Sequence, residues 1–179
     1  MVDELLDLVN EDDKLIGTIL RNSTENMTKG YLRAAEAFIQ NDEGKLWIPR
    51  RQMNKRIAPG GLDYSMGEHV MSGEDYLSAC IRGFKEELNM MVNEESLKFI
   101  KKFVPREGLR YFRTLYLYSS NKVPKYNSND FTEHFWLSPK ELVAKLKLGE
   151  PAKTSLLESA LYLAEHNALK QNYFNRAVI

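Results

Sequence analysis

Residues 67–90 decide the fold of this chain, and they read GEHVMSGEDYLSACIRGFKEELNM. From Glu74 onward the apolar residues recur every three or four positions, which is the period of an α-helix with one face on a core. This apolar stripe consists of Leu77, Cys80, Ile81, Phe84 and Leu88. We therefore predict an amphipathic helix from Glu74 to about Asn89.

The other side of this predicted helix carries an acidic pair, Glu86 and Glu87. Successive helical residues are rotated by about 100°, so these two side chains project away from the apolar stripe, on the same side as Gly83. Carboxylate oxygens suit a hard cation such as Mg²⁺, which links protein to phosphate oxygens. An acidic pair is also common on a solvated face, where Arg82 would merely pair with Glu86 one turn away. Both interpretations remain open from the residues alone.

Short apolar segments on both sides of the helix are typical of strands. They cover residues 5–9, 14–19, 31–40, 45–49, 97–104, 109–119 and 131–137. Residues 60–73 read as a glycine-rich loop leading into the helix. Ser138 followed by Pro139 predicts another helix start, and a last helix covers about 152–170, before a loosely held tail over 171–179. We expect one α/β domain over residues 1–179, with a mixed sheet covered by helices on both faces.

The overall composition argues against several classes of partner. Lys+Arg and Asp+Glu each number 25, so there is no net charge to attract a nucleic-acid polymer or an anionic membrane. Cys80 is the only cysteine, which excludes an intramolecular disulfide and suits a reducing compartment. The beginning has no secretory signal pattern, and no run approaches about 20 apolar residues. We expect a cytoplasmic protein with no membrane partner, and a homodimer remains open.

The spacing of the charged residues resembles the Nudix box, G-x5-E-x7-R-E-U-x-E-E-x-G-U, in which U is a bulky apolar residue. The box would cover residues 68–90, and four charged residues stand at its fixed positions: Glu74, Arg82, Glu86 and Glu87. This resemblance implies the Nudix α/β/α sandwich with a mixed sheet. It also implies a hydrolase that uses Mg²⁺, or alternatively Mn²⁺, to cleave a diphosphate linkage in a nucleoside diphosphate derivative or related small molecule.

Three positions depart from the box: Glu68 and Asn89 replace its glycines, and Gly83 replaces the glutamate after the arginine. Asparagine tolerates the left-handed conformation that ends a helix, so Asn89 is a mild change. The glutamate missing at Gly83 commonly serves the family as a metal ligand or a base. Glu68 could partly compensate by reaching inward, although a side chain that simply points to solvent is the alternative. Restoring the family residue by Gly83→Glu is expected to strengthen metal binding.

The resemblance also assigns roles to residues inside and outside the helix. Glu86 and Glu87 would hold the metal, with Glu68 and Glu133 as further ligand candidates and Asp130 as a second acid near Glu133. In the catalytic set, Glu74 and Arg82 would fix the loop against the helix. Residues 50–63 form a predicted loop rich in cationic side chains, which we call the basic loop. It would bind the diphosphate through Arg50, Arg51 and Lys55. Ordinary solubilising charge is the alternative for each of these cations.

Motifs outside the box resemble the Nudix branch related to isopentenyl-diphosphate isomerase. They include Pro59-Gly60 and the stretch from Glu133 to Pro139. The isomerase uses a cysteine two positions before a histidine; here His69 is present, but Gly67 stands at the cysteine position. We therefore expect no isomerase activity. A catalytically weakened or inactive Nudix protein that binds a nucleotide or a protein partner remains the main alternative to the hydrolase.

Overall fold

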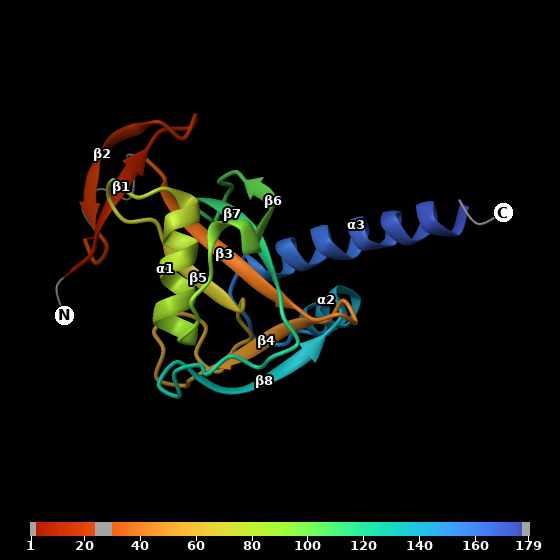
Figure 1. Ribbon diagram of the computed structural model, residues 1–179. Helices are drawn as coiled ribbons and strands as arrows, with labels where there is room; N and C mark the ends of the chain where they lie inside the picture. The colour runs from red at the N-terminus through yellow and green to blue at the C-terminus, as the bar shows by residue number, and fades with distance from the viewer. Residues whose placement is uncertain (1–2, 24–29, 177–179) are drawn as a thin grey trace.

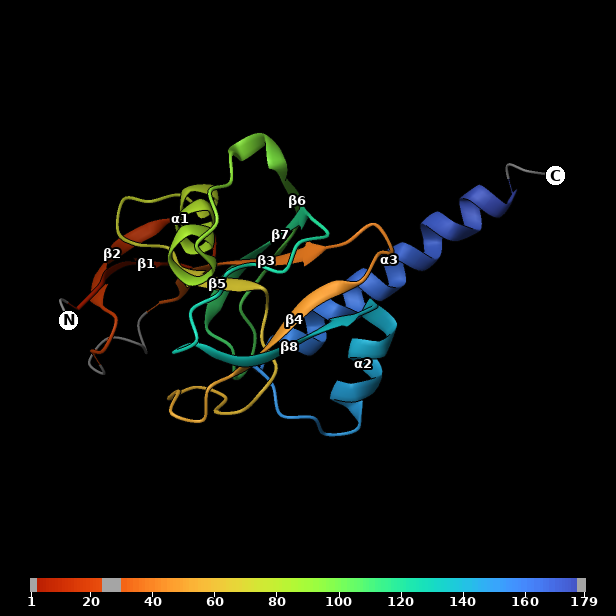
Figure 2. The same cartoon turned by 60° about the horizontal axis from the view of Figure 1, so that its bottom comes forward.

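The computed structural model describes residues 3–23 and 30–176, with side chains up to residue 166. A six-stranded mixed sheet lies between helix α1 (Tyr76–Leu88) on one face and helices α2 (Pro139–Lys147) and α3 (Leu156–Arg176) on the other (Figures 1 and 2). The strands of this sheet are β3 (Leu32–Gln40), β4 (Leu46–Arg51), β5 (Met66–His69), β6 (Leu97–Phe103), β7 (Tyr111–Ser119) and β8 (Phe131–Leu137). The predicted α/β/α sandwich is confirmed.

Strand β3 is the centre of the sheet, whose order is β6-β7-β3-β4-β8. It runs parallel to β7 and forms a hairpin with β4, in which Gln40 faces Leu46. Strand β5 pairs antiparallel with the first half of β3, from Ala34 opposite His69 to Ala37 opposite Met66. The connection from β3 to its parallel neighbour β7 therefore contains β4, β5, α1 and β6. This crossover places α1 directly over β5 and β3.

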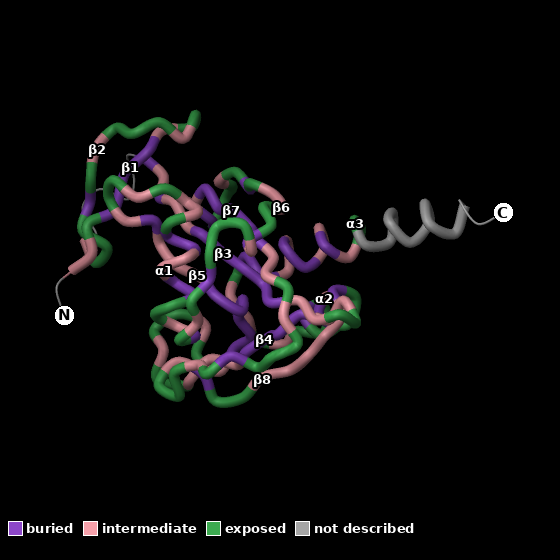
Figure 3. Tube along the Cα trace, viewed as in Figure 1, coloured by how far each residue is buried: buried purple, intermediate pink, exposed green. Residues whose placement is uncertain are grey.

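Side chains alternate along β3 between two separate apolar cores. Ala35, Ala37 and Ile39 face α1, where they join the buried stripe that includes Phe84. Phe38 points to the opposite face, into the core formed with α2 and α3. Figure 3 shows these central strands buried between exposed loops. The amphipathic helix predicted from the stripe is confirmed, with Leu77 and Ile81 only partly buried at its edge.

A separate hairpin formed by β1 (Leu5–Val9) and β2 (Leu15–Leu20) closes one end of the sandwich. Val9 exchanges backbone hydrogen bonds with Tyr31, at the start of β3. Leu6 bridges to Met71, in the turn before α1. The hairpin therefore lies beside the segment that leads from β5 into α1.

The structure differs from the sequence predictions in two elements. Strand β5 lies inside the segment predicted as a loop, because β3 supplies a partner for a glycine-containing stretch that has little strand propensity of its own. Helix α3 continues to Arg176, where the sequence predicted a tail from Gln171. No glycine or proline follows Pro151 to end that helix. Most of the loop predicted over residues 22–30 lies outside the described residues, as do residues 177–179.

A short 3-10 helix, η1 (Glu94–Ser96), leads from α1 into β6. In the described part of the chain, no helix is long and apolar enough to cross a membrane.

A buried ion pair ties the sheet to the beginning of α3. Arg113 on β7 is almost completely buried and donates to Glu36 on β3 at 2.9 Å. Arg113 also pairs with Glu158 on α3. The second oxygen of Glu36 accepts a hydrogen bond from Ser155 at 3.1 Å, just before α3 begins. This network fixes the segment that leads into α3.

Replacing Arg113 with Met should lower the free energy of unfolding by about 3–5 kcal/mol, because Glu36 would remain buried without its cationic partner. The double change Arg113→Met with Glu36→Met should cost clearly less, because no uncompensated charge remains. Urea unfolding of the three proteins measures both effects. A single change that costs no more than the double change would contradict the importance of the charge pair.

Candidate active site

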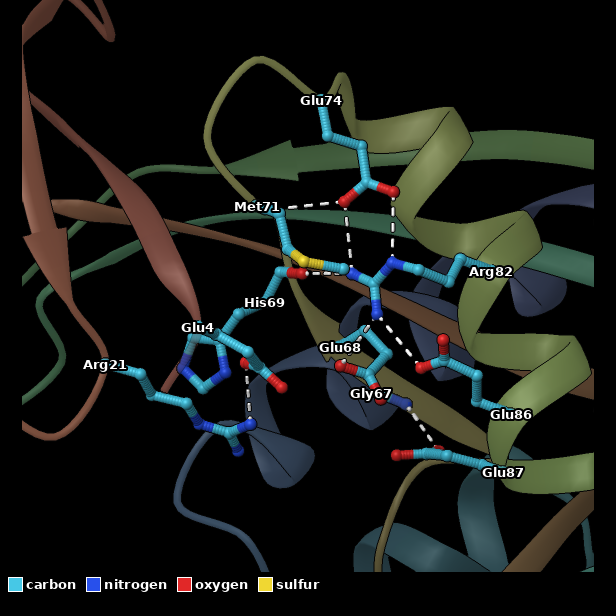
Figure 4. A network of polar contacts seen from close by, with 10 residues as sticks. All are labelled: Glu4, Arg21, Gly67, Glu68, His69, Met71, Glu74, Arg82, Glu86 and Glu87. Carbon is cyan, nitrogen blue, oxygen red and sulfur yellow. Dashed lines mark hydrogen bonds and ion pairs between the residues drawn. The ribbon is translucent and has the colours of Figure 1, made fainter. Parts of the chain in front are cut away.

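Arg82 joins α1 to the turn that precedes it. Its Nε and Nη2 atoms donate to the two carboxylate oxygens of Glu74, at 3.1 and 3.0 Å (Figure 4). Nη2 also donates to the backbone carbonyl of His69, at the end of β5, at 2.8 Å. Glu74 in turn accepts a hydrogen bond from the backbone N–H of Met71 at 3.0 Å. One guanidinium thus holds the helix, the turn and β5 in a fixed arrangement.

The remaining guanidinium nitrogen of Arg82 faces two further acids of the box. Nη1 lies 3.2 Å from Glu86 and 3.5 Å from Glu68. The Glu86 side chain is 54% exposed, whereas that of Glu68 is 14% exposed. Glu68 therefore points inward, toward Arg82. Of the two orientations that the sequence left open for Glu68, inward or toward solvent, its side chain adopts the inward one.

Glu87 is the most confined acid of the group. It accepts a hydrogen bond from the backbone N–H of Gly67 at 3.2 Å. Burial, followed by the negative charge of Glu68, raises the pKa of Glu87 to about 8. The positive charge of Lys153 only partly opposes this rise. Its carboxylate would be stabilised by additional positive charge.

Lys153 is a residue of this site that the sequence did not single out. It lies between α2 and α3, and its Nζ is 3.1 Å from Oδ1 of Asp63. Burial alone would lower the pKa of Lys153, but the carboxylates of Asp63 and Glu87 outweigh it and raise the pKa. The ammonium group stays charged beside the acidic residues of the box. No motif includes Lys153, and only the pairing of distant segments brings it here.

Gly83 lies where β5 comes closest to α1. A Cβ atom on Gly83 would lie 2.4 Å from Sδ of Met66 and 2.7 Å from Cγ of Glu68. The Glu68 side chain thus occupies space beside the helix that a side chain at position 83 would need. The expectation that Gly83→Glu alone would strengthen the site is corrected on this ground, because that side chain has no room while Met66 and Glu68 keep their positions.

The three cations assigned to the diphosphate, two at the end of β4 and one in the loop after it, all have acidic partners. Arg50 pairs with Glu133 and Glu150, Arg51 pairs with Asp63, and Lys55 pairs with Asp130. Arg51 and Lys153 both pair with Asp63. Because Lys153 also interacts with Glu87, this shared partner brings Arg51 close to the Nudix box. Arg50 is instead bound to Glu133, whose side chain is 52% exposed. The structure shows no contact between Glu133 and the acids around Arg82.

His69 is held in its neutral form. Burial, together with the positive charges of Arg21 and Lys153, lowers the pKa of its imidazole to about 3. The ring packs against Tyr111, with a centroid distance of 5.6 Å, and lies near Arg21 of the β1–β2 hairpin (Figure 4). A neutral imidazole in this position cannot donate a proton from its cationic form near pH 7.

Known proteins share this arrangement of sequence and fold. The NUDIX domain pattern matches residues 30–159. An uncharacterised Nudix hydrolase from Nostoc sp. is 42% identical over 158 residues, covering 87% of this chain and 92% of that protein. A Nudix hydrolase from Deinococcus radiodurans is 40% identical, covering 87% and 91% of the two chains.

Two further matches concern the fold and the relation to isopentenyl-diphosphate isomerases. A crystal structure from Deinococcus radiodurans matches with a TM-score of 0.79 and 37% identity, covering 89% of this chain and 99% of that one. Isopentenyl-diphosphate Delta-isomerase 1 from Photorhabdus laumondii is 32% identical over 100 residues, or 56% of each chain. With a domain match over most of its length and relatives near 40% identity, the chain belongs to the Nudix hydrolase family.

Proposed function

We propose that this protein is a Mg²⁺-dependent hydrolase that cleaves a diphosphate linkage in a nucleoside diphosphate derivative or a related small molecule. The observation that carries this proposal is the environment of Glu87. Its carboxylate is buried beside Glu68 and has a pKa raised to about 8. A divalent cation would supply the positive charge that this pair of acids lacks.

The donor groups fit such an ion. Mg²⁺ prefers oxygen ligands, keeps several waters and is usually bound through one or two carboxylates together with substrate phosphates. Among the described residues, no three acidic, histidine or cysteine side chains form a ready-made metal cage. We assign Glu87 and Glu86 as the protein's ligands, with Glu68 nearest to them. When bound, the ion would neutralise the diphosphate and lower the pKa of a bound water; Mn²⁺ could replace it.

The other residues would position the substrate. Arg82 and Glu74 hold the turn before α1 in place, so that Gly67 and Glu87 keep their contact. Arg51 would contact the diphosphate through its guanidinium group, which suits phosphate oxygens. Glu68 would supply the carboxylate that the family places at position 83. For Arg50, Lys55 and Glu133, a role in the site requires that their present ion pairs open.

One observation favours the alternative of a nucleotide-binding protein without catalysis. Gly83 carries no carboxylate, and Arg50, Arg51 and Lys55 already have acidic partners within the chain. The isomerase alternative lacks support at the site itself. Gly67 provides no thiol, and a Cβ atom there would lie 3.2 Å from Nζ of Lys153.

A panel of dinucleotides, nucleotide sugars, nucleoside diphosphates and nucleoside triphosphates tests the reaction. With Mg²⁺, wild-type protein should release phosphate or a monophosphate from at least one member, whereas isopentenyl diphosphate should remain unconverted. The Glu87→Gln variant should lose this activity and bind Mg²⁺ more than about tenfold more weakly. The exposed Glu95→Gln change is the matched control. Mg²⁺ binding without any hydrolysis would support the binding protein instead, and an unaffected Glu87→Gln variant would refute the assigned site.

The raised pKa of Glu87 predicts a pH-dependent metal affinity. Because a protonated carboxyl group must release its proton to bind Mg²⁺, the affinity should increase with pH, by up to about tenfold per pH unit. The increase should level off above the pKa of about 8. Calorimetry in two buffers of different ionisation enthalpy measures the affinity and the released proton together. A constant affinity across this range, with no proton release, would contradict the prediction.

The crowding at Gly83 predicts an unusual response to substitution. Glycine to alanine inside a helix normally stabilises by about 0.5–1 kcal/mol. Here Gly83→Ala should instead destabilise by about 1–3 kcal/mol, because its methyl group would press on Met66 and Glu68. Urea unfolding measures this change, with the exposed Lys85→Ala on the same helix as control.

A double substitution extends the same test to the metal site. Gly83→Glu alone should lose both stability and Mg²⁺ affinity, whereas Gly83→Glu with Glu68→Gly should recover part of both. The double variant removes the overlap with Glu68 and leaves only the overlap with Met66, so the recovery should be partial. If the double variant is no better than Gly83→Glu alone, Glu68 does not stand in for the missing glutamate.

A further inference from the structure

Lys153 reaches the site from a segment remote from the Nudix box. Residues 151–153 run beside Leu62: the Leu62 N–H donates to the Pro151 carbonyl at 2.7 Å, and the Lys153 N–H donates to the Leu62 carbonyl at 3.0 Å. Two residues later, Ser155 hydrogen-bonds to the buried Glu36. The Lys153 backbone is therefore anchored on both sides. Its ammonium group occupies a defined position.

Asp63 holds two cations next to each other. One oxygen of its carboxylate lies 3.1 Å from Nζ of Lys153, and the other pairs with Nη1 of Arg51. Asp63 is nearly buried, with a side chain that is 4% exposed, whereas Lys153 and Arg51 are 23% and 14% exposed. The two cations thus have some solvent-accessible surface while their shared acid is covered. Such a pair can meet an anionic ligand without losing its own fixed position.

Gly67 connects this cation pair to Glu87. The Gly67 N–H donates to the Glu87 carboxylate. If Gly67 carried a Cβ atom, that atom would lie 3.2 Å from Nζ of Lys153. The ammonium group and the proposed metal ligand therefore both lie next to Gly67. A diphosphate whose oxygens share a cation with Glu87 would also come within reach of Lys153.

We infer that Lys153, held beside Arg51 by Asp63, is a further diphosphate-binding residue of this site. The inference rests on the proposed function for the class of substrate, but it concerns binding and not cleavage. An ammonium group binds phosphate oxygens as a point charge with three N–H donors, and charge-assisted hydrogen bonds of this kind are the strong ones. Within the Nudix box, Arg82 is already surrounded by Glu68, Glu74 and Glu86, and the other cation, Lys85, is exposed to solvent.

Calorimetry with inorganic pyrophosphate at saturating Mg²⁺ tests this inference. Lys153→Met keeps much of the side-chain length and removes the charge, so it should weaken pyrophosphate binding by about 10- to 100-fold. Lys153→Arg keeps a cation and should retain most of the affinity. Lys147→Met is the matched control, because Lys147 is an exposed lysine at the end of α2. Its pyrophosphate affinity should equal that of the wild type.

Titration with Mg²⁺ alone separates ligand binding from a purely structural role. At a pH where Glu87 is ionised, the Mg²⁺ affinity of Lys153→Met should be unchanged or higher, because the substitution removes a positive charge near the proposed metal ligand. If Lys153 only held the site together, affinities for Mg²⁺ and pyrophosphate would fall in parallel. In wild-type protein, the NMR signal of the Lys153 ammonium group should shift when pyrophosphate is added, while that of Lys147 should not. This measurement tests the contact without any substitution.

Several outcomes would overturn the inference: wild-type protein that binds no pyrophosphate with Mg²⁺, an undiminished affinity in Lys153→Met, a parallel loss of both affinities, or an unshifted Lys153 signal. The failure of the proposed function is a different result. Wild-type protein that binds pyrophosphate through Lys153 and hydrolyses no member of the substrate panel would refute the hydrolase and leave the inference intact.

Discussion

Strand β5 packs so closely on α1 that a methyl group on Gly83 would meet Sδ of Met66 at 2.4 Å. This close approach lets Glu68 extend along the charged side of the helix as far as Arg82. It also brings the backbone N–H of Gly67 to the carboxylate of Glu87. The position of Glu68 therefore depends on the absence of a side chain at position 83. A glycine thus allows the strand to bring a further negative charge to the charged side of α1.

Charge in the site is divided into two parts. Arg82 is shared by three acids of the box and cannot fully neutralise them. Lys153 and Arg51 share Asp63, which already balances one of their two charges. Glu87 forms no ion pair within the described residues, and burial together with the negative charge of Glu68 raises its pKa. An acidic part next to a cationic part suits a ligand that combines a metal ion with a diphosphate.

Much of this arrangement could be predicted from the sequence, because it depends on local periodicity. The stripe containing Phe84 predicted the buried face of α1, and the spacing from Glu74 to Arg82 indicated two residues that do form an ion pair. The inward direction of Glu68 follows from a strand that local propensity did not predict, since β5 depends on its pairing with β3. The sequence offered no signal for the partner of Arg50, because that contact depends on the register that places Arg50 opposite Glu133.

Lys153 shows the same limit at longer range. Its place beside Asp63 depends on the bridge between Leu62 and Ala152, which joins segments that are far apart along the chain. Two glycines that depart from family patterns then have a common explanation. At Gly83, the space for a side chain is taken by Met66 and Glu68 from β5; at Gly67, it is taken by the ammonium group of Lys153. In both places a side chain from another segment packs against a glycine: Glu68 from β5 against Gly83, and Lys153 against Gly67. The two glycines therefore allow charged side chains from outside α1 to come close to the charged residues of that helix.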